Sequence, residues 1–195
     1  MGKIYYIMGK SSSGKDTLFK AVCDRMPELR TVTLYTTRPA REGERDGVEY
    51  FFVSDDQLKK YTEQGKVIEL RTYNTIHGEW KYATIDDGQI NLDEADYLMI
   101  GTLESYKKLC AYYGKDMLVP IYIEVEDGER LSRALIRERQ QATPRYAEMC
   151  RRFLADTEDF SEENLEAAGI RKRYYNNDRM KCLEEIIGEI QHGKL

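Results

Sequence analysis

Short apolar runs alternate with segments of helical periodicity along most of the chain. The runs predict buried strands and span residues 3–8, 31–35, 97–100, 117–123 and 173–175. Apolar residues recur every three or four positions over 18–26, 103–113, 127–141 and 178–191, a spacing that predicts helices. Strands that alternate with helices indicate an α/β fold, in which helices flank a parallel sheet on both faces.

The pattern changes between residues 48 and 84, where short segments alternate polar and apolar residues. Examples are 48–53 and 66–70. Such segments are typical of a mixed or antiparallel sheet, so we expect a small mixed-β lobe inserted into the core. A chain of 195 residues is long enough for one well-packed core with appended lobes, and a single domain is expected.

Composition and charge exclude several classes of function. With 33% charged residues and a net charge of −5, a broad basic face is not expected, and neither is nucleic acid as a partner. Apolar runs stay far below the ~18 residues of a membrane span, and no charged leader opens the chain, so a cytoplasmic protein without membrane contact is expected. His77 and His192 are the two histidines, which disfavours a hydrolase triad built on His77. Nothing indicates an oligomeric state.

The loop after the first predicted strand reads GKSSSGKDT and nearly matches a phosphate-binding loop. The candidate ATP-binding residues are Gly9, Lys10, Ser11, Ser12, Ser13, Gly14, Lys15, Asp16 and Thr17. In the usual pattern, G-x-x-x-x-G-K-[ST], backbone N–H groups and the lysine hold phosphates while the last hydroxyl meets magnesium. A strand before and a helix after the loop favour this interpretation over a flexible Ser/Gly turn. Asp16 replaces the hydroxyl, so Asp16 and Thr17 are the candidate metal ligands.

A second candidate phosphate site follows in the segment TTRPAREGERDGVEY, residues 36–50. Arg38 and Arg41 are three positions apart on a Pro/Gly-rich loop, where two planar guanidinium groups can converge on one phosphate. Tyr50 offers a hydroxyl donor at the start of the next strand. The alternative is an ordinary charged surface loop.

The third cluster is rich in arginine and contains no lysine. Its members are Arg130, Arg133, Arg137, Arg139, Arg145, Arg151 and Arg152. Arginines on a mobile segment commonly stabilise a phosphoryl group during transfer, which suggests a helical lid. The alternative is simple ion pairing with Glu129, Glu138 and Glu148.

In this order, the loop, the segment 36–50, the strand with Glu69 and the arginine-rich helices resemble the guanylate kinase family over nearly the whole chain. The most specific match is residues 36–44 with Gly47 and Tyr50, which has the residue types and spacing of that family's GMP-phosphate clamp. The resemblance implies ATP-dependent phosphorylation of a purine nucleoside monophosphate, GMP or dGMP, with Mg²⁺ accompanying ATP.

The same resemblance implies an acceptor site. Its residues would be Arg38, Arg41, Glu44, Tyr50, Glu69, Tyr82 and Thr84. Arg38, Arg41, Tyr50 and Tyr82 would hold the acceptor phosphate. Glu69 would read guanine, because a carboxylate accepts hydrogen bonds from the N1 and N2 edge that adenine lacks, while Thr84 would donate to O6.

On the ATP side, the resemblance implies a catalytic set of Lys15 and lid arginines. Arg152 matches one family arginine, and Arg137 and Arg139 both lie near the position of the other. Asn177 would lie beside the adenine. The implied parts of the single domain are a core (1–34, 85–126 and 170–195), an acceptor-binding lobe (35–84) and a lid (127–169).

Three places depart from that family's pattern. A serine is expected near Leu34 and Tyr35, two acids at Met99 and Gly101, and Ser, Thr or Gly at Asp16. The GKD loop and the glycine at the strand end resemble a related family, the ribose 1,5-bisphosphate phosphokinases, which supply a second candidate function. A third candidate is a non-catalytic guanylate kinase-like module that binds protein partners.

Asp16 suggests a specific hypothesis about the metal. A carboxylate beside a triphosphate is unfavourable unless a cation lies between them. We therefore expect Asp16 to supply the negative charge toward Mg²⁺ that Met99 and Gly101 cannot. The alternative is that Asp16 only stabilises the positive N-terminus of its helix.

Overall fold

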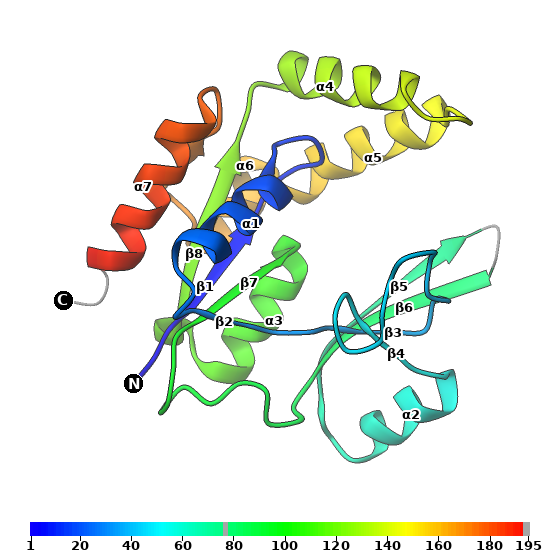
Figure 1. Cartoon of the computed structure of the whole chain (residues 1–195), viewed down its shortest axis with the longest axis vertical. Helices are drawn as coiled ribbons and strands as arrows, with labels where there is room; N and C mark the ends of the chain where they lie inside the picture. Colours follow the sequence, from blue (N-terminus) through cyan, green and yellow to red (C-terminus); the bar gives the residue numbers. More distant parts are fainter. Residues whose placement is uncertain (76–77, 193–195) are drawn as a thin grey trace.

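The computed structural model describes residues 1–75 and 78–192. Within these residues, the larger sheet has five parallel strands in the order β2-β7-β1-β8-β9. The strands are β1 (Ile4–Met8), β2 (Arg30–Thr31), β7 (Tyr97–Gly101), β8 (Leu118–Glu124) and β9 (Tyr174–Tyr175). β1 is buried along its length in the middle of this sheet, so the loop after it leaves the sheet centrally (Figure 1).

Helices cover both faces of the sheet. Successive residues of a strand point to opposite sides, so β1 contributes side chains to an apolar core on each face. Tyr5 and Ile7 of β1 share an apolar core with α1 (Lys15–Arg25) and α7 (Arg179–His192). Tyr6 and Met8 pack on the other side, with α3 (Leu103–Tyr113) and α6 (Glu162–Ala167). A short 3-10 helix, η1 (Lys115–Met117), leads from α3 into β8.

A second sheet, in the order β4-β3-β6-β5, forms a lobe beside the core (Figure 1). Its elements are β3 (Tyr35–Thr36), β4 (Phe51–Phe52), α2 (Asp55–Glu63), β5 (Val67–Thr75) and β6 (Gly78–Ile85). β3 pairs in parallel with β4 and antiparallel with β6, so the sheet is mixed. Leu58 of α2 packs on Tyr35 and Ala83, which gives the lobe a small core of its own.

Two helices carry most of the arginine cluster, α4 (Asp127–Arg139) and α5 (Tyr146–Asp159), and they lie against each other (Figure 1). The Glu126 carboxylate caps α4 by accepting the N–H groups of Gly128 (2.9 Å) and Glu129 (2.9 Å). These bonds hold the pKa of Glu126 below its usual value. The cap fixes the direction in which α4 leaves β8, and so the placement of its first turn beside the phosphate loop.

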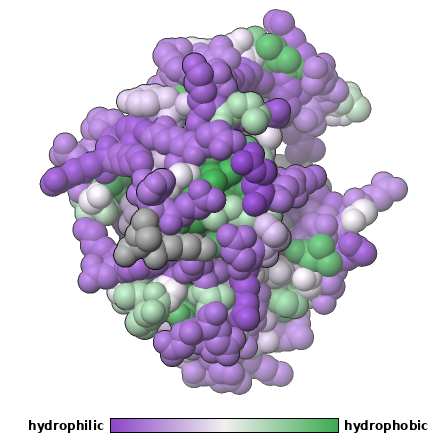
Figure 2. Space-filling view, turned by 60° about the vertical axis from the view of Figure 1, so that its left-hand side comes forward, coloured by the Kyte–Doolittle hydropathy of each residue, from purple (hydrophilic) through white to green (hydrophobic). Residues whose placement is uncertain are grey.

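The predicted α/β fold with an inserted mixed sheet is confirmed. The single strand predicted over 31–35 is wrong, because Arg30–Thr31 extend the parallel sheet while Tyr35–Thr36 belong to the mixed one. None of the helices described is long and apolar enough to cross a membrane. The face in Figure 2 is mostly hydrophilic, and its apolar areas are small and separate. His77 lies outside the described residues.

Candidate active site

The loop of residues 9–17 joins β1 to α1 and packs closely against its surroundings. A Cβ at Gly9 would lie 2.5 Å from the carbonyl oxygen of Ile123, and one at Gly14 would lie 2.4 Å from Nδ2 of Asn176. The first approach, to the backbone, leaves no room for a side chain, and the second would displace the amide of Asn176. Gly14 also has φ 84°, and Ser12 has φ 63°, which curves the loop around the start of α1. The N–H groups gathered there can bind phosphate.

The turn after β9 supports this loop. Nδ2 of Asn176 is buried and donates to the carbonyl oxygen of Ser13 (2.8 Å), and Arg133 donates to the carbonyl oxygen of Asn176 (3.3 Å). The hydroxyl of Ser13 is buried, with no hydrogen-bond partner in the described part of the chain. Asn177 is exposed, and its contact with adenine stays a prediction. Asn176 holds the loop, a role that the sequence pattern did not reveal.

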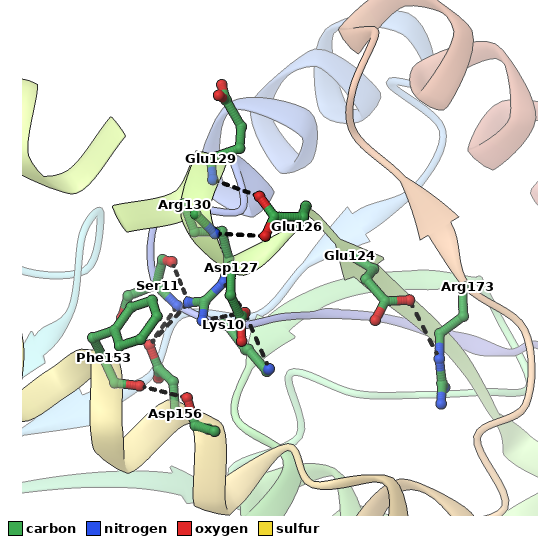
Figure 3. Close-up of polar contacts among 12 residues, drawn as sticks. Lys10, Ser11, Glu124, Glu126, Asp127, Glu129, Arg130, Phe153, Asp156 and Arg173 are labelled. Atoms are coloured by element: carbon green, nitrogen blue, oxygen red, sulfur yellow. Dashed lines mark hydrogen bonds and ion pairs between the residues drawn. The ribbon is translucent and has the colours of Figure 1, made fainter. Parts of the chain in front are cut away.

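Arg130 connects the lid to the loop (Figure 3). Its buried guanidinium donates to the carbonyl oxygen of Ser11 (3.0 Å) and to Oδ1 of Asp127 (2.7 and 3.0 Å). It also lies 4.7 Å from the ring centre of Phe153 in α5. Oδ2 of Asp156 accepts the N–H of Ser11 (2.7 Å). Side chains from both lid helices therefore hold the two backbone polar groups of Ser11, and sequence reasoning missed both Asp156 and this use of Arg130.

A cavity of about 380 Å³ lies between the loop and the lid helices. Among the residues that line it are Ser11, Ser12, Lys15, Asp16, Arg130, Arg137, Glu148, Arg152 and Phe153. Arg137 reaches the loop and donates from Nη2 to Oγ of Ser12 (3.2 Å). Arg152 is held by Glu148 (2.9 Å). Arg139 is exposed and does not line the cavity, so the helix register favours Arg137 of the two candidates.

Lys15 and Asp16 lie at this cavity as an exposed ion pair (Nζ to Oδ2, 3.2 Å), and the Asp16 side chain is 83% exposed. Thr17 is exposed beside them. Nζ of Lys10 forms an ion pair with Oδ1 of Asp127 (3.4 Å). Across residues 1–75 and 78–192, no three His, Cys, Asp or Glu side chains converge as a ready metal site. The oxygen donors of Asp16 and Thr17 suit Mg²⁺, and the phosphates of a nucleotide would complete its ligands.

Of the four residues predicted to clamp the acceptor phosphate, Arg38, Tyr50 and Tyr82 come together on the lobe. Only 3% of the Arg38 side chain is exposed, and its guanidinium donates to both carboxylate oxygens of Glu44 at 2.7 Å. It also lies over the rings of Tyr50 (5.1 Å) and Phe52 (5.5 Å). Tyr82 meets Tyr50 edge-on, with ring centres 5.6 Å apart. This arrangement presents one guanidinium and two phenols in one place.

Glu44 orients the clamp. Besides the fork of Arg38, its carboxylate accepts the backbone N–H of Arg41 (2.8 Å), whose side chain is exposed. These bonds, that of Arg38 first, lower the pKa of Glu44 to about 2. Nε of Arg38 is buried and has no hydrogen-bond partner among the described residues. Buried donors are rarely left unsatisfied, and a phosphate oxygen would satisfy this one.

Glu69 and Thr84 face each other across β5 and β6. The Glu69 side chain is 0% exposed. Its carboxylate accepts hydrogen bonds from Nε (3.0 Å) and Nη2 (3.2 Å) of Arg71, from Thr84 (3.0 Å) and from Ser105 of α3 (3.4 Å). The contact between Glu69 and guanine stays a prediction. The structure adds Arg71, which no motif indicated, as the ion-pair partner of Glu69.

The strand end at 99–101 does not suit the two acids that the family resemblance implies there, for a different reason at each position. A Cβ at Gly101 would lie 2.0 Å from the hydroxyl oxygen of Tyr6. Burial raises the pKa of Tyr6, so its phenol stays protonated in this space. Met99 is buried in the core. Tyr6 therefore occupies the position that an acidic side chain at residue 101 would need.

A phosphoryl transferase must hold both its donor and its acceptor by their phosphates, and here the two candidate phosphate sites lie on separate parts of one α/β unit. Fold and site together define a P-loop nucleoside monophosphate kinase. The family model for guanylate kinase matches residues 1–92, which include the loop and the whole lobe. A guanylate kinase of Geobacter metallireducens is 30% identical over 203 residues, covering 95% of this chain and 86% of that protein. The chain belongs to the guanylate kinase family.

Other matches differ in extent. A guanylate kinase of Pseudomonas fluorescens is 36% identical over 100 residues, covering 49% of this chain and 48% of that protein. That match thus spans about half the length of the relative. The solved guanylate kinase of Anaplasma phagocytophilum has a TM-score of 0.67 and 17% identity, and the superposition covers 100% of this chain and 87% of that one. This structure shows a shared fold.

Proposed function

We propose that the protein transfers the terminal phosphoryl group of ATP to a purine nucleoside monophosphate, with GMP or dGMP as acceptor. The observation that carries this proposal is the buried Arg38, whose Nε has no partner among the described residues. It lies beside two tyrosines on a lobe separate from the phosphate loop. Relatives named guanylate kinase support the same reaction.

On the donor side, the loop N–H groups and Lys15 hold the β- and γ-phosphates, and Asn177 lies beside the adenine. Closure of α4 and α5 brings Arg137 and Arg152 to the transferred group and excludes water. An acceptor phosphate oxygen bonds to the γ-phosphorus while the bond to the bridging oxygen breaks, and ADP leaves. No side chain acts as the nucleophile.

On the acceptor side, Arg38, Arg41, Tyr50 and Tyr82 hold the phosphate, with Glu44 fixing Arg38. A magnesium ion that enters with ATP would be held by Asp16 and Thr17 and would offset phosphate charge. Because its substrates are nucleotides of the cell interior, we also propose a cytoplasmic location.

A coupled assay of ADP release tests this function. The acceptors to compare are GMP, dGMP, AMP, UMP and ribose 1,5-bisphosphate, each with ATP and Mg²⁺. GMP and dGMP are expected to give the highest kcat/KM. Turnover with the sugar bisphosphate alone would replace the nucleotide by that acceptor, and a folded protein that binds GMP but turns over none of the five would be a binding module.

A further inference from the structure

Ser12, in the middle of the phosphate loop, has a strained backbone. Its φ of 63° makes it the one residue other than glycine with a positive φ among residues 1–75 and 78–192. In this left-handed region the Cβ of an L-residue crowds the following carbonyl oxygen, so such a conformation persists only where surrounding contacts hold it. The loop curves here around the start of α1, where its N–H groups gather. The contacts that hold Ser12 therefore decide whether the loop has its phosphate-binding shape before ATP arrives.

Two side chains of the lid fix the peptide groups on the N-terminal side of Ser12. Oδ2 of Asp156, in α5, accepts the N–H of Ser11 at 2.7 Å, and Arg130, in α4, donates to the carbonyl oxygen of the same residue at 3.0 Å (Figure 3). The loop's own backbone hydrogen bond across Ser12 is longer, at 3.2 Å. A carboxylate acceptor forms a charge-assisted hydrogen bond, which is about twice as strong as a neutral one. The lid thus restrains this part of the loop more firmly than the loop restrains itself.

Asp156 is suited to hold the loop rather than to compete with its ligand. The described residues that line the cavity between the loop and the lid include Ser11 and Arg130 but not Asp156. The side chain of Asp156 is 18% exposed, and Nη1 of the buried Arg130 lies 3.8 Å from its Oδ2. A cation beside the carboxylate offsets the negative charge that a triphosphate would otherwise meet. Asp156 can therefore keep its bond to the loop while a nucleotide occupies the cavity.

We propose that Asp156 is a positioning residue of the donor site, which holds the N–H of Ser11 and thereby keeps Ser12 in its left-handed conformation before ATP binds. Without this bond, Ser12 relaxes to a more favourable φ, and only a fraction of the molecules keep the loop in its binding shape. The apparent affinity for a nucleotide falls in proportion to that fraction. The inference rests on the proposed use of ATP, but not on the identity of the acceptor.

Binding of ADP, measured by calorimetry, gives the first test because it needs no acceptor. Asp156→Ala should raise the Kd for ADP about 10-fold, as when one molecule in ten keeps the binding shape. Asp156→Asn keeps an acceptor oxygen without its charge and should raise this Kd about three-fold. The Kd for GMP should not change, since the lobe is built on a separate sheet. The matched control is Asp159→Ala, the same change at an exposed acid of α5, which should leave both affinities unchanged.

A change at Ser12 tests whether Asp156 acts through the strained residue. Glycine adopts the left-handed region without a steric penalty, so Ser12→Gly removes the need for the restraint. In that background Asp156→Ala should raise the Kd for ADP less than about two-fold, against about 10-fold when Ser12 is present. Each loss is measured within its own background, so any effect of Ser12→Gly alone cancels. Equal losses in the two backgrounds would overturn the inference, because Asp156 would then act elsewhere.

The remaining outcomes also decide. An unchanged or lower Kd for ADP in Asp156→Ala would overturn the inference, and a lower one would show that the carboxylate competes with phosphate. An equal rise in the Kd for GMP would overturn it too, because the structure would then be damaged in general. Arg130 keeps its ion pair with Asp127 in these variants, which favours folding. If circular dichroism shows that Asp156→Ala does not fold, Asp156→Asn in the two backgrounds decides alone.

The same measurements separate this inference from the proposed function. Failure to phosphorylate GMP or any other acceptor would overturn the proposed function and leave the comparison of ADP affinities intact. A folded protein that does not bind ADP would overturn both.

Discussion

The donor side and the acceptor lobe hold their arginines in different ways. On the donor side, Arg137 and Arg152 are exposed at the edge of an open cavity. On the lobe, Arg38 and Arg71 are largely buried, and each is forked to a carboxylate. Exposed ion pairs cost little to break, whereas buried forks fix a guanidinium before any ligand arrives. We therefore expect the lid arginines to move to the transferred group, and Arg38 to be preorganised for the acceptor.

Arg130 is the exception that links the two arrangements. It belongs to the lid by sequence but is buried like the arginines of the lobe, and its partners include the backbone of the phosphate loop. The lid is therefore anchored to the phosphate loop both at the first turn of α4 and, through Asp156, in α5. Substitutions on either side should affect different quantities: stability and ATP binding at Arg130, acceptor binding on the lobe.

The largest expected effect is that of Arg130→Met. This substitution removes the lid arginine that is buried like the arginines of the lobe. It leaves the carbonyl oxygen of Ser11 without its donor and removes a buried cation from Asp127. The unsatisfied carbonyl oxygen and the lost charge-assisted hydrogen bonds together cost about 3 kcal/mol of the free energy of unfolding, measurable by urea denaturation. The matched change Arg133→Met, at a half-exposed position on the same helix, should cost less than about 1 kcal/mol. Equal losses for the two variants would contradict the special role of Arg130.

Arg38→Lys should have the next largest effect, and it breaks the preorganisation of the lobe. Lysine keeps the charge but cannot form the fork with Glu44 or offer a second planar donor. We expect kcat/KM for GMP to fall about 30-fold, equivalent to about 2 kcal/mol, with the KM for ATP unchanged. A rise in the KM for ATP as large as that for GMP would show that the two sides are not independent.

The pH dependence of acceptor binding also tests whether the clamp on the lobe is preorganised. The pKa of Glu44 is lowered to about 2, so its contribution is complete above the carboxyl's ordinary pKa and is lost only as pH falls toward 2. The carboxylate therefore stays charged throughout the range in which the enzyme is assayed. The KM for GMP should show no titration of Glu44 between about pH 5 and 9.

Much of the fold follows from periodicity and from the motif at residues 9–17, because both are local patterns. The buried strand β1 and helices α3 and α7 appear close to their predicted bounds. Tertiary partners are different. Asp156 binds the N–H of Ser11 from 145 positions away, and Tyr6 fills the space beside Gly101. No spacing rule predicts such contacts, since they depend on how separate elements pack.

Arg71 illustrates this limit within the site itself. Glu69 can be singled out by resemblance to a motif. Whether its carboxylate is paired, however, depends on whether the residue two positions along the same face is a cation. In a strand, residues i and i+2 share a face, so the pairing of Glu69 and Arg71 was within reach of sequence reasoning. The hydrogen bonds from Thr84 and Ser105 were not, because they require β6 and α3 to meet there.

The smallest expected effect concerns Asp16, the exposed acid on the donor side. Among the described residues, its carboxylate pairs with Lys15 alone, and this pair is exposed (3.2 Å), so Asp16→Asn should change the melting temperature little. If Asp16 serves the metal, the Mg²⁺ concentration for half-maximal activity should rise and kcat should fall about five-fold, the value of one screened charge contact. Asp16→Glu, which keeps the charge, should restore part of the loss.

Gly101→Asp is not expected to rescue Asp16→Asn, since its Cβ would lie 2.0 Å from the hydroxyl oxygen of Tyr6. Whether Asp16 supplies the negative charge that Met99 and Gly101 cannot must therefore be judged from the Mg²⁺ titration. If Asp16→Asn leaves that titration unchanged and only lowers the melting temperature slightly, Asp16 serves the positive N-terminus of α1 instead. The donor side would then bind its metal through Thr17 and the nucleotide's own phosphates, and its acid would be structural, as Glu44 is on the lobe.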